Sequence, residues 1–309
     1  MSNLWVTLDN NSASKAIAAG DNSLYQLHDS GKIWRFNGTP LTGWDLLDNN
    51  PATRAIVTSG NQLYQLHDSG KIWKFNGTPL TGWDLLDNNP ATKSIVAAGK
   101  QLYQLHADGK IWRFNGTPLT GWDLLDNNPA TKTIVAAGNQ LYQLHDSGKI
   151  WRFNGTPLTG WDLLDQNADS MAIVAAYTPP HVGHQTPPGG FGDPSTPEKD
   201  HLYQIHKSGK IWRYVGPPLT GWELLDANPA SSSIAASGEG LFQAHADGTV
   251  WSYIGPPMTG WASLGEFPGL VSLVAGGGVE ISGIASHIAS GIFVLQSNGT
   301  IKQYIEVIT

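Results

Sequence analysis

A glutamine, a histidine, a lysine and a tryptophan recur at fixed spacing along the 309-residue chain, and one copy is Gln104, His106, Lys110 and Trp112. Gly109 suits the left-handed position of a three-residue hairpin turn. That turn places His106 opposite Lys110. Two residues further from the turn, Gln104 then lies opposite Trp112. Because side chains alternate along a strand, all four lie on one face of the hairpin. A sugar ring can stack on the indole while its hydroxyls meet the polar groups, so the set predicts a carbohydrate pocket.

The glutamine, histidine and tryptophan occur in five further copies of the motif, and the lysine in four of them. The histidines and tryptophans are His28, Trp34, His67, Trp73, His145, Trp151, His206, Trp212, His245 and Trp251. Acidic and amide residues end the segment after each Gly-Trp pair and lie toward the same side, and the candidates there are Asp48, Asn49, Asp87, Asn88, Asp126 and Asn127. A seventh copy has Gln296, Asn298 and Lys302 in place of His, Asp and Trp, so at most six copies carry the set.

Structural roles are the alternative for each residue type. The tryptophans can pack between neighbouring units, the histidines can cap strand ends, and Asp-Asn-Asn-Pro is typical of a turn in which Asx side chains bond their own backbone. An Asp in the hairpin turn followed by a Trp on the next strand also resembles the hydrogen-bond network of WD-type blades. Both interpretations of the set stay open at this point.

The motif belongs to an internal repeat. Tryptophans at 5, 44, 83, 122, 161, 222 and 261 are spaced by 39 residues, except for one interval that is longer by 22. One unit contains four strand candidates, at 93–98, 101–106, 110–114 and 121–125, separated by Gly, Pro, Asn and Asp. Four short strands per repeat of about 40 residues are typical of a β-propeller blade. Small residues such as Ala97, Ala98 and Gly99 suit the innermost strand, where blades crowd together.

Seven units predict an all-β, seven-bladed β-propeller of four-stranded blades that occupies residues 1–309 as a single domain. The segment around Trp5 supplies one outer strand, and residues 270–305 supply three strands that lack a fourth. Pairing the N-terminal strand into the last blade closes the ring and removes both edges.

A Pro- and Gly-rich insertion at 177–200 is expected as a loop between the first two strands of blade 5. Its His181, His184, Asp193, Asp200 and His201 could hold a metal, but nothing in their spacing favours one. We expect no metal and no cofactor.

Composition excludes several classes of function. Lys and Arg number 18 and Asp and Glu 25, for a net charge of −7, which argues against nucleic acid as a partner. The absence of cysteine excludes disulfides and thiolate chemistry. No apolar run is long enough to insert into a membrane. The first residues lack a basic and apolar leader, which predicts a cytoplasmic protein, or one exported without a conventional signal peptide.

Catalysis is not expected. The chain has no nucleophile elbow, P-loop or HExxH motif. An active site also needs one asymmetric constellation, whereas this chain presents near-copies of one unit. Repeated weak sites instead gain through avidity, by roughly 10²- to 10⁴-fold.

The segment 102–126, Leu-Tyr-Gln-Leu-His-Ala-Asp-Gly-Lys-Ile-Trp-Arg-Phe-Asn-Gly-Thr-Pro-Leu-Thr-Gly-Trp-Asp-Leu-Leu-Asp, resembles the tectonin-type and tachylectin-type β-propeller repeats. The resemblance covers essentially the whole chain. It implies a multivalent lectin that binds glycans or glycoconjugates in equivalent pockets between blades. The alternative is a protein-interaction scaffold that binds one polypeptide partner at unit stoichiometry and ignores free sugars.

Overall fold

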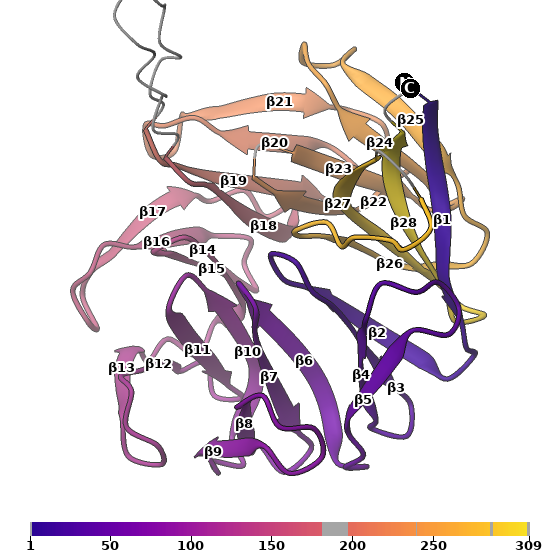
Figure 1. The fold of residues 1–309 in the computed structure, drawn as a ribbon. Coiled ribbons are helices and arrows are strands. Elements are labelled where there is room, and N and C mark those ends of the chain that lie inside the picture. Colours follow the sequence, from indigo (N-terminus) through magenta and orange to yellow (C-terminus); the bar gives the residue numbers. More distant parts are fainter. Residues whose placement is uncertain (1, 181–196, 239, 285–286, 308–309) are drawn as a thin grey trace, which may run out of the picture.

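The computed structural model describes residues 2–180, 197–238, 240–284 and 287–307. These residues form seven four-stranded antiparallel sheets and no helix. Each sheet is one blade of a ring (Figure 1), as the repeat predicts.

The strands follow the repeat from blade to blade. Blade 1 comprises β2 (Ser14–Ala19), β3 (Leu24–His28), β4 (Ile33–Phe36) and β5 (Trp44–Asp48). Blade 2 comprises β6 (Thr53–Ser59), β7 (Gln62–His67), β8 (Ile72–Phe75) and β9 (Trp83–Asp87). Blade 3 comprises β10 (Thr92–Ala98), β11 (Gln101–His106), β12 (Ile111–Phe114) and β13 (Trp122–Asp126). Blade 4 comprises β14 (Thr131–Ala137), β15 (Gln140–His145), β16 (Ile150–Phe153) and β17 (Trp161–Asp165).

The remaining blades carry the departures from the repeat. Blade 5 comprises β18 (Ser170–Thr178), β19 (Lys199–His206), β20 (Ile211–Tyr214) and β21 (Trp222–Asp226). Blade 6 comprises β22 (Ser231–Ser237), β23 (Gly240–His245), β24 (Thr249–Tyr253) and β25 (Trp261–Glu266). Blade 7 comprises β26 (Leu270–Ala275), β27 (His287–Gln296), β28 (Thr300–Val307) and β1 (Ser2–Asn10).

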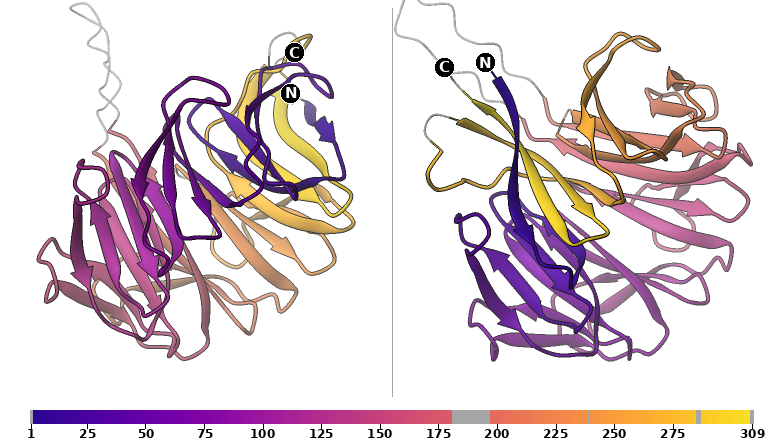
Figure 2. Two further views of the ribbon diagram at one scale, coloured as in Figure 1. Left: turned by 90° about the horizontal axis from the view of Figure 1, so that it is seen from below. Right: turned by 90° about the vertical axis from the view of Figure 1, so that its right-hand side faces the viewer.

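The N-terminal strand closes the ring, which confirms the prediction. β1 pairs antiparallel with β28, with Leu4 opposite Ile305 and Thr7 opposite Lys302. The innermost strands of blades 1 and 7, β2 and β26, lie against each other as the other neighbouring inner strands do. Both termini lie at the same side of the ring (Figure 2).

The ring has two unlike faces. The hairpin face carries the turn between the second and third strands and the link to the next blade, at 107–110 and 127–130 in blade 3. The loop face carries the turn between the first and second strands and the loop between the third and fourth, at 99–100 and 115–121. The predicted insertion also leaves from the loop face. β18 and β19 extend into its two ends, as far as Thr178 and from Lys199, and residues 181–196 lie outside the described residues.

The hydrophobic core lies between blades. Tyr103, Leu105 and Ile111 of blade 3 pack with Ile134 and Leu141 of blade 4, and comparable clusters join the other blades. Each blade therefore buries both faces of its sheet against its neighbours, at roughly 25 cal/mol per Å² of apolar surface.

The Gly-Trp tryptophans pack between blades, as expected. The centre of the Trp122 ring lies 5.1 Å from that of the Phe114 ring, with the two planes tilted by 50°, and Trp122 Nε1 donates to the Leu86 carbonyl of the preceding blade at 3.3 Å. The same bond recurs at Trp44, Trp83, Trp161, Trp222 and Trp261.

Candidate binding site

The predicted hairpin set comes together in the predicted register. Gln104 pairs with Trp112, and Gly109 adopts a φ of 85° in the turn. His106 Nε2 lies 3.1 Å from Gln104 Oε1, and the His106 and Trp112 rings are 5.7 Å apart. Lys110 lies at the edge of the set, and its ammonium pairs with Asp108 of the same turn.

The polar members of the set are enclosed by the preceding blade. Gln104 Nε2 donates to Asp87 Oδ2 of blade 2 at 2.8 Å, and Gln104 Oε1 accepts from Thr92 Oγ1 at 2.6 Å. Gln104 is 1% exposed and His106 is 4% exposed. We call the Asp–Gln–Thr/Ser–His set the inter-blade clamp. Four further blades contain the Asp–Gln bond, between Gln65 and Asp48, Gln143 and Asp126, Gln204 and Asp165, and Gln243 and Asp226.

The clamp uses the hydrogen-bonding groups that were assigned to a sugar. A buried amide that already donates to a carboxylate and accepts from a hydroxyl has little capacity left for a ligand. The half-buried tryptophans have enclosed Nε1 atoms at Trp34, Trp73, Trp112, Trp151 and Trp212, while Trp251 Nε1 donates to Thr249. This side of the blade therefore holds neighbouring blades together in the structure.

The Asp-Asn-Asn-Pro segments form turns. Asp87 Oδ1 accepts from the Asn88 backbone N–H at 2.9 Å, and Asn89 Oδ1 accepts from the Ala91 N–H at 3.0 Å. The aspartates Asp48, Asp87 and Asp126 are buried, whereas the side chains of Asn49, Asn88 and Asn127 are exposed on the hairpin face. Of the candidates in these segments, only the asparagines are free to meet a ligand.

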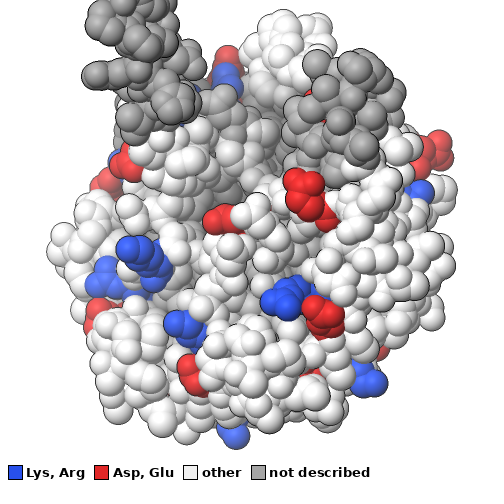
Figure 3. Space-filling model, in the orientation of Figure 1, with Lys and Arg blue, Asp and Glu red and all other residues white. Residues whose placement is uncertain are grey.

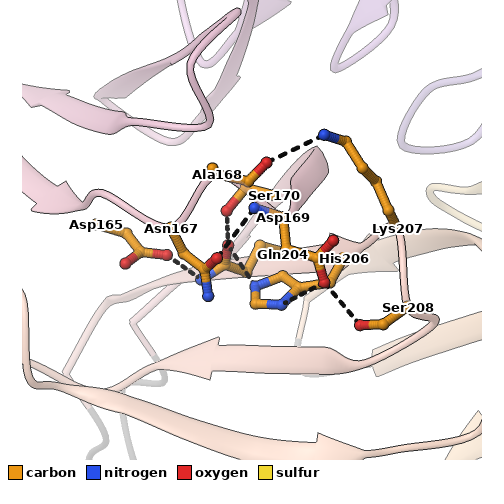
Figure 4. A network of polar contacts seen from close by, with 9 residues as sticks. All are labelled: Asp165, Asn167, Ala168, Asp169, Ser170, Gln204, His206, Lys207 and Ser208. Atoms are coloured by element: carbon orange, nitrogen blue, oxygen red, sulfur yellow. Dashed lines mark hydrogen bonds and ion pairs between the residues drawn. The ribbon is translucent and has the colours of Figure 1, made fainter.

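Blade 5 has an acidic variant of the clamp (Figure 4). Asp169 occupies a position that is alanine in blades 1 to 4 and 6. Its Oδ2 lies 3.6 Å from His206 Nδ1 and accepts from Ser208 Oγ at 2.8 Å, while His206 Nε2 meets Gln204. A catalytic triad needs the serine hydroxyl on the imidazole rather than on the carboxylate. The cluster therefore lacks a serine placed for activation by His206.

Burial favours the neutral form of five of the hairpin histidines. Burial lowers the pKa of His106 below its usual 6.5, against the opposing effect of Asp108 and Asp87, and burial likewise lowers the pKa of His28, His67, His145 and His206. Gln104 Oε1 is an amide oxygen and can only accept hydrogen bonds, as it does from Thr92. A neutral His106 therefore donates to it through Nε2.

We predict that the protein loses stability on acidification below about pH 6.5. Between this pH and the lowered pKa of the folded state, the histidines of the unfolded chain bind protons, whereas the buried histidines of the folded chain do not. The free energy of unfolding therefore falls with the pH over this range. The variant His106→Gln, which copies Gln296 of blade 7, should have a shallower decline between pH 8 and 5 in thermal unfolding. An identical slope for the variant and the wild type would refute this role of His106.

The opposite side of each blade carries polar residues that the sequence reasoning missed. Tyr103 pairs with Arg113, and Arg113 pairs with Asp123 across the strands of blade 3. Arg113 Nη2 lies 3.2 Å from Asp123 Oδ2, whose other oxygen accepts from Asn115. A groove of about 450 Å³ opens there toward the loop face, with Gln140 of blade 4 on its other wall. The signal was present in the sequence as the alternate residues of the same strands.

This ionic pair recurs around the ring, as Arg35 with Asp45, Arg152 with Asp162 and Arg213 with Glu223. Blade 2 places Lys74 opposite Asp84. The side chains are about one-third or more exposed, so the pairs contribute little to stability, by about 0–1 kcal/mol each. Their exposure leaves them free to meet a ligand.

The loops between the third and fourth strands present one apolar side chain each. Leu41, Leu80, Leu119, Leu158, Leu219 and Met258 have φ values of 66 to 69°. They are 47 to 51% exposed. The backbone N–H of Leu119 donates to the Leu86 carbonyl of the preceding blade at 2.8 Å, which anchors the loop, and the Leu119 side chain remains half exposed. We call these six residues the loop-tip ring.

The axis of the propeller opens on the loop face. Inner strands line an apolar channel with residues such as Val57, Val96, Val135 and Val174, and Ala97 lies in the same wall. The mouth of the channel is a cavity of about 800 Å³ that includes Ala98 and Gly99, as expected for the innermost strand.

Charge is dispersed on this face. Figure 3, which looks onto the loop face, shows small groups of either sign separated by uncharged surface. Within the described parts of the chain, no helix could cross a membrane and no three His, Asp or Glu side chains are grouped as a metal site. His181, His184 and Asp193 lie outside the described residues.

No protein-family model matches the chain, and no curated protein matches it in sequence. Solved structures match the chain in their fold. "YCF48 bound to D1 peptide" aligns with a TM-score of 0.60 at 14% identity, over 99% of this chain and 97% of that chain. Yeast RCC1 (Prp20), bound to Kap60, gives 0.59 at 10% identity over 96% and 80%. Human WBSCR16 gives 0.58 at 8% identity over 96% and 87%. These similarities show the seven-bladed propeller fold, while membership of the tectonin and tachylectin group stays a prediction.

Proposed function

We propose that the protein is a non-catalytic binding propeller that holds a polypeptide partner on its loop face. The observation that carries the proposal is the loop-tip ring. Single exposed apolar residues are normal on a protein surface, but six at equivalent positions around the ring form a repeated contact surface.

The positive φ at these six positions makes an apolar side chain there unexpected, because other residue types fit this backbone better. A leucine at positive φ is strained by about 1–3 kcal/mol, whereas glycine or asparagine adopts this conformation readily. Blades 5 and 6 have changed their loops from Asn-Gly-Thr-Pro to Val-Gly-Pro-Pro and Ile-Gly-Pro-Pro, yet Leu219 and Met258 retain an apolar side chain there. Strain that persists in diverged copies supports a role for the side chain in binding.

The solved structures with this fold point the same way. One is described as bound to a D1 peptide and another as bound to Kap60, so in both cases the partner is a polypeptide. The enclosed clamp adds to this, because it removes Gln104 and His106 from the groups that a sugar could reach. The absence of a free nucleophile–base pair in the clamp supports a binding role over catalysis.

A multivalent lectin is the second candidate, and the ionic grooves favour it. A phenol, a guanidinium, a carboxylate and amides around a groove of about 450 Å³ offer the donors and acceptors that sugar hydroxyls need. In that case the pockets between blades hold Tyr103 and Arg113 in place of the predicted Gln104 and His106. Replacing Arg113 by Ser should then lower the number of bound sugars by one in calorimetry.

The test compares peptides and glycans on the same folded protein. A displayed library of random dodecapeptides, each about 40 Å long when extended, is selected against the wild type, and the labelled protein is also applied to a glycan array. We expect peptide binding and a blank array. Binding of related glycans at several equivalent sites, without peptide binding, would overturn the proposal in favour of the lectin.

The loop-tip ring is tested by replacing all six residues with Asn, which tolerates positive φ. We expect the selected dodecapeptides to bind at least tenfold more weakly, while relief of strain raises the melting temperature or leaves it unchanged. A matched control replaces Asn49, Asn88 and Asn127 on the hairpin face with Ser. Loss of binding in the control, with none in the ring variant, would place the partner on the other face.

A further inference from the structure

The groove between blades 6 and 7 differs in its chemistry from the grooves that follow blades 1 to 5. Between blades 6 and 7, Ser252 stands where blade 3 has Arg113, and Ala262 stands where it has Asp123. The ion pair is therefore lost at this place in the ring. A groove of about 410 Å³ opens there, and its lining includes Phe242, Ile292 and Tyr304.

The lip of this groove is apolar as well. Ile254 follows Tyr253 as Asn115 follows Phe114 in blade 3, so an amide has been replaced by a branched alkyl group. Ile254 lines the groove and is 71% exposed. Phe242, Ile292 and Tyr304 below it are buried. An apolar floor under an exposed isoleucine is the arrangement that accepts a bulky apolar side chain from a partner.

The polar groups around the groove suit a partner segment that offers backbone amides and one basic side chain. The hydroxyls of Ser252 and Ser263 lie in its lining and can exchange hydrogen bonds with backbone amides. Glu306 is the one charged residue among the lining residues, which include neither lysine nor arginine. A basic residue next to the inserted apolar side chain would meet this carboxylate.

We propose that the groove between blades 6 and 7 is the principal docking site for the polypeptide partner. The site takes an extended segment that inserts one aromatic or branched apolar side chain and places a lysine or arginine against Glu306. The inference rests on the proposed function and adds to it the location of the site, the chemistry of the segment and a stoichiometry of one. The five junctions that follow blades 1 to 5 each carry an acid–base pair. Those junctions cannot take this segment without burying the two charges.

The chain supplies the variant that tests the site. Ser252→Arg, Ile254→Asn and Ala262→Asp together restore the residues that blade 3 has at these positions. The variant should fold, because blades 1, 3 and 4 hold the same three residues, and Arg213 of blade 5 already lies over Tyr253 as the new arginine would over Tyr304. A circular dichroism spectrum and a melting curve check the fold.

The probes are labelled nonapeptides with a central tryptophan, leucine or serine, flanked by two lysines or by two glutamates. We expect the wild type to bind one copy of the tryptophan or leucine peptide with lysine flanks. Glutamate flanks or a central serine should weaken binding at least tenfold, and so should the triple variant.

The outcomes separate this inference from the proposed function. If the triple variant binds both the nonapeptides and the selected dodecapeptides as the wild type does, while the loop-tip variant does not bind the dodecapeptides, the docking site is wrong and the function stands. Equal binding of lysine- and glutamate-flanked peptides removes the role of Glu306. A wild type that binds none of the peptides overturns both.

Discussion

A chain that lacks residues 1–10 is expected to lose the cooperative unfolding of the intact ring and to self-associate. β1 supplies the outer strand of blade 7, and its removal leaves the edge of β28 unpaired. Leu8 is fully buried in a cluster with Phe293 and Ile301, and the loss of this one side chain costs about 2–5 kcal/mol. Trp5 Nε1 also donates to the Leu264 carbonyl at 2.6 Å, which ties blade 7 to blade 6.

The measurement is thermal unfolding together with light scattering over a range of protein concentrations. A matched truncation that removes only residues 1–3 leaves Leu4 and the buried part of β1 in place and should behave as the wild type. A synthetic peptide of residues 1–12 should restore the melting curve of the longer truncation by pairing with β28. Unchanged melting and a monomeric state after removal of residues 1–10 would mean that the strand does not close the ring.

The second large effect is expected for Gln104→Val, which breaks one clamp. Asp87 Oδ2 then loses its amide donor in a buried site, Thr92 Oγ1 keeps only the Asn89 carbonyl, and His106 loses an acceptor. A buried polar group without a partner costs about 1–3 kcal/mol. We therefore expect the free energy of unfolding to fall by about 2–4 kcal/mol, because the neighbouring polar groups cannot all find new partners.

Blade 7 shows why the partners matter more than the glutamine itself. There Val294 replaces the clamp glutamine and Leu270 replaces the threonine, and both pack with Phe267 in a cluster without a buried amide. An apolar junction is thus stable when all of its members are apolar. Gln101→Val, on the same strand but partly exposed, is the control and should cost less than about 1 kcal/mol. Equal losses for the two variants would show that the clamp adds nothing beyond ordinary packing.

The two candidate functions place different demands on the same ring. A lectin needs several equal grooves, which blades 1 to 5 supply through their acid–base pairs. A scaffold for one partner needs a groove unlike those of blades 1 to 5, which the junction of blades 6 and 7 supplies. The divergence of blades 5 and 6 from the repeat, while their loop tips remain apolar, favours the scaffold.

The sequence by itself determined the fold. The 39-residue spacing, the four strand candidates per unit and the incomplete units at the two ends were sufficient to predict seven blades and a closure by the N-terminal strand. These features are local or periodic, so they can be read without knowing what packs against what. The pairing of Gln104 with Trp112 was predicted for the same reason, because a hairpin turn sets its own register.

Only the tertiary structure decided which side of a blade is open. Alternation shows that Gln104, His106 and Trp112 share a face, but both faces of a blade are covered by its neighbours. The partner of Gln104 is Asp87, 17 residues earlier and on another sheet. The open groove instead has Arg113 of one blade and Gln140 of the next in its lining. Such a groove exists only where two packed sheets meet, and no single unit of the repeat contains it.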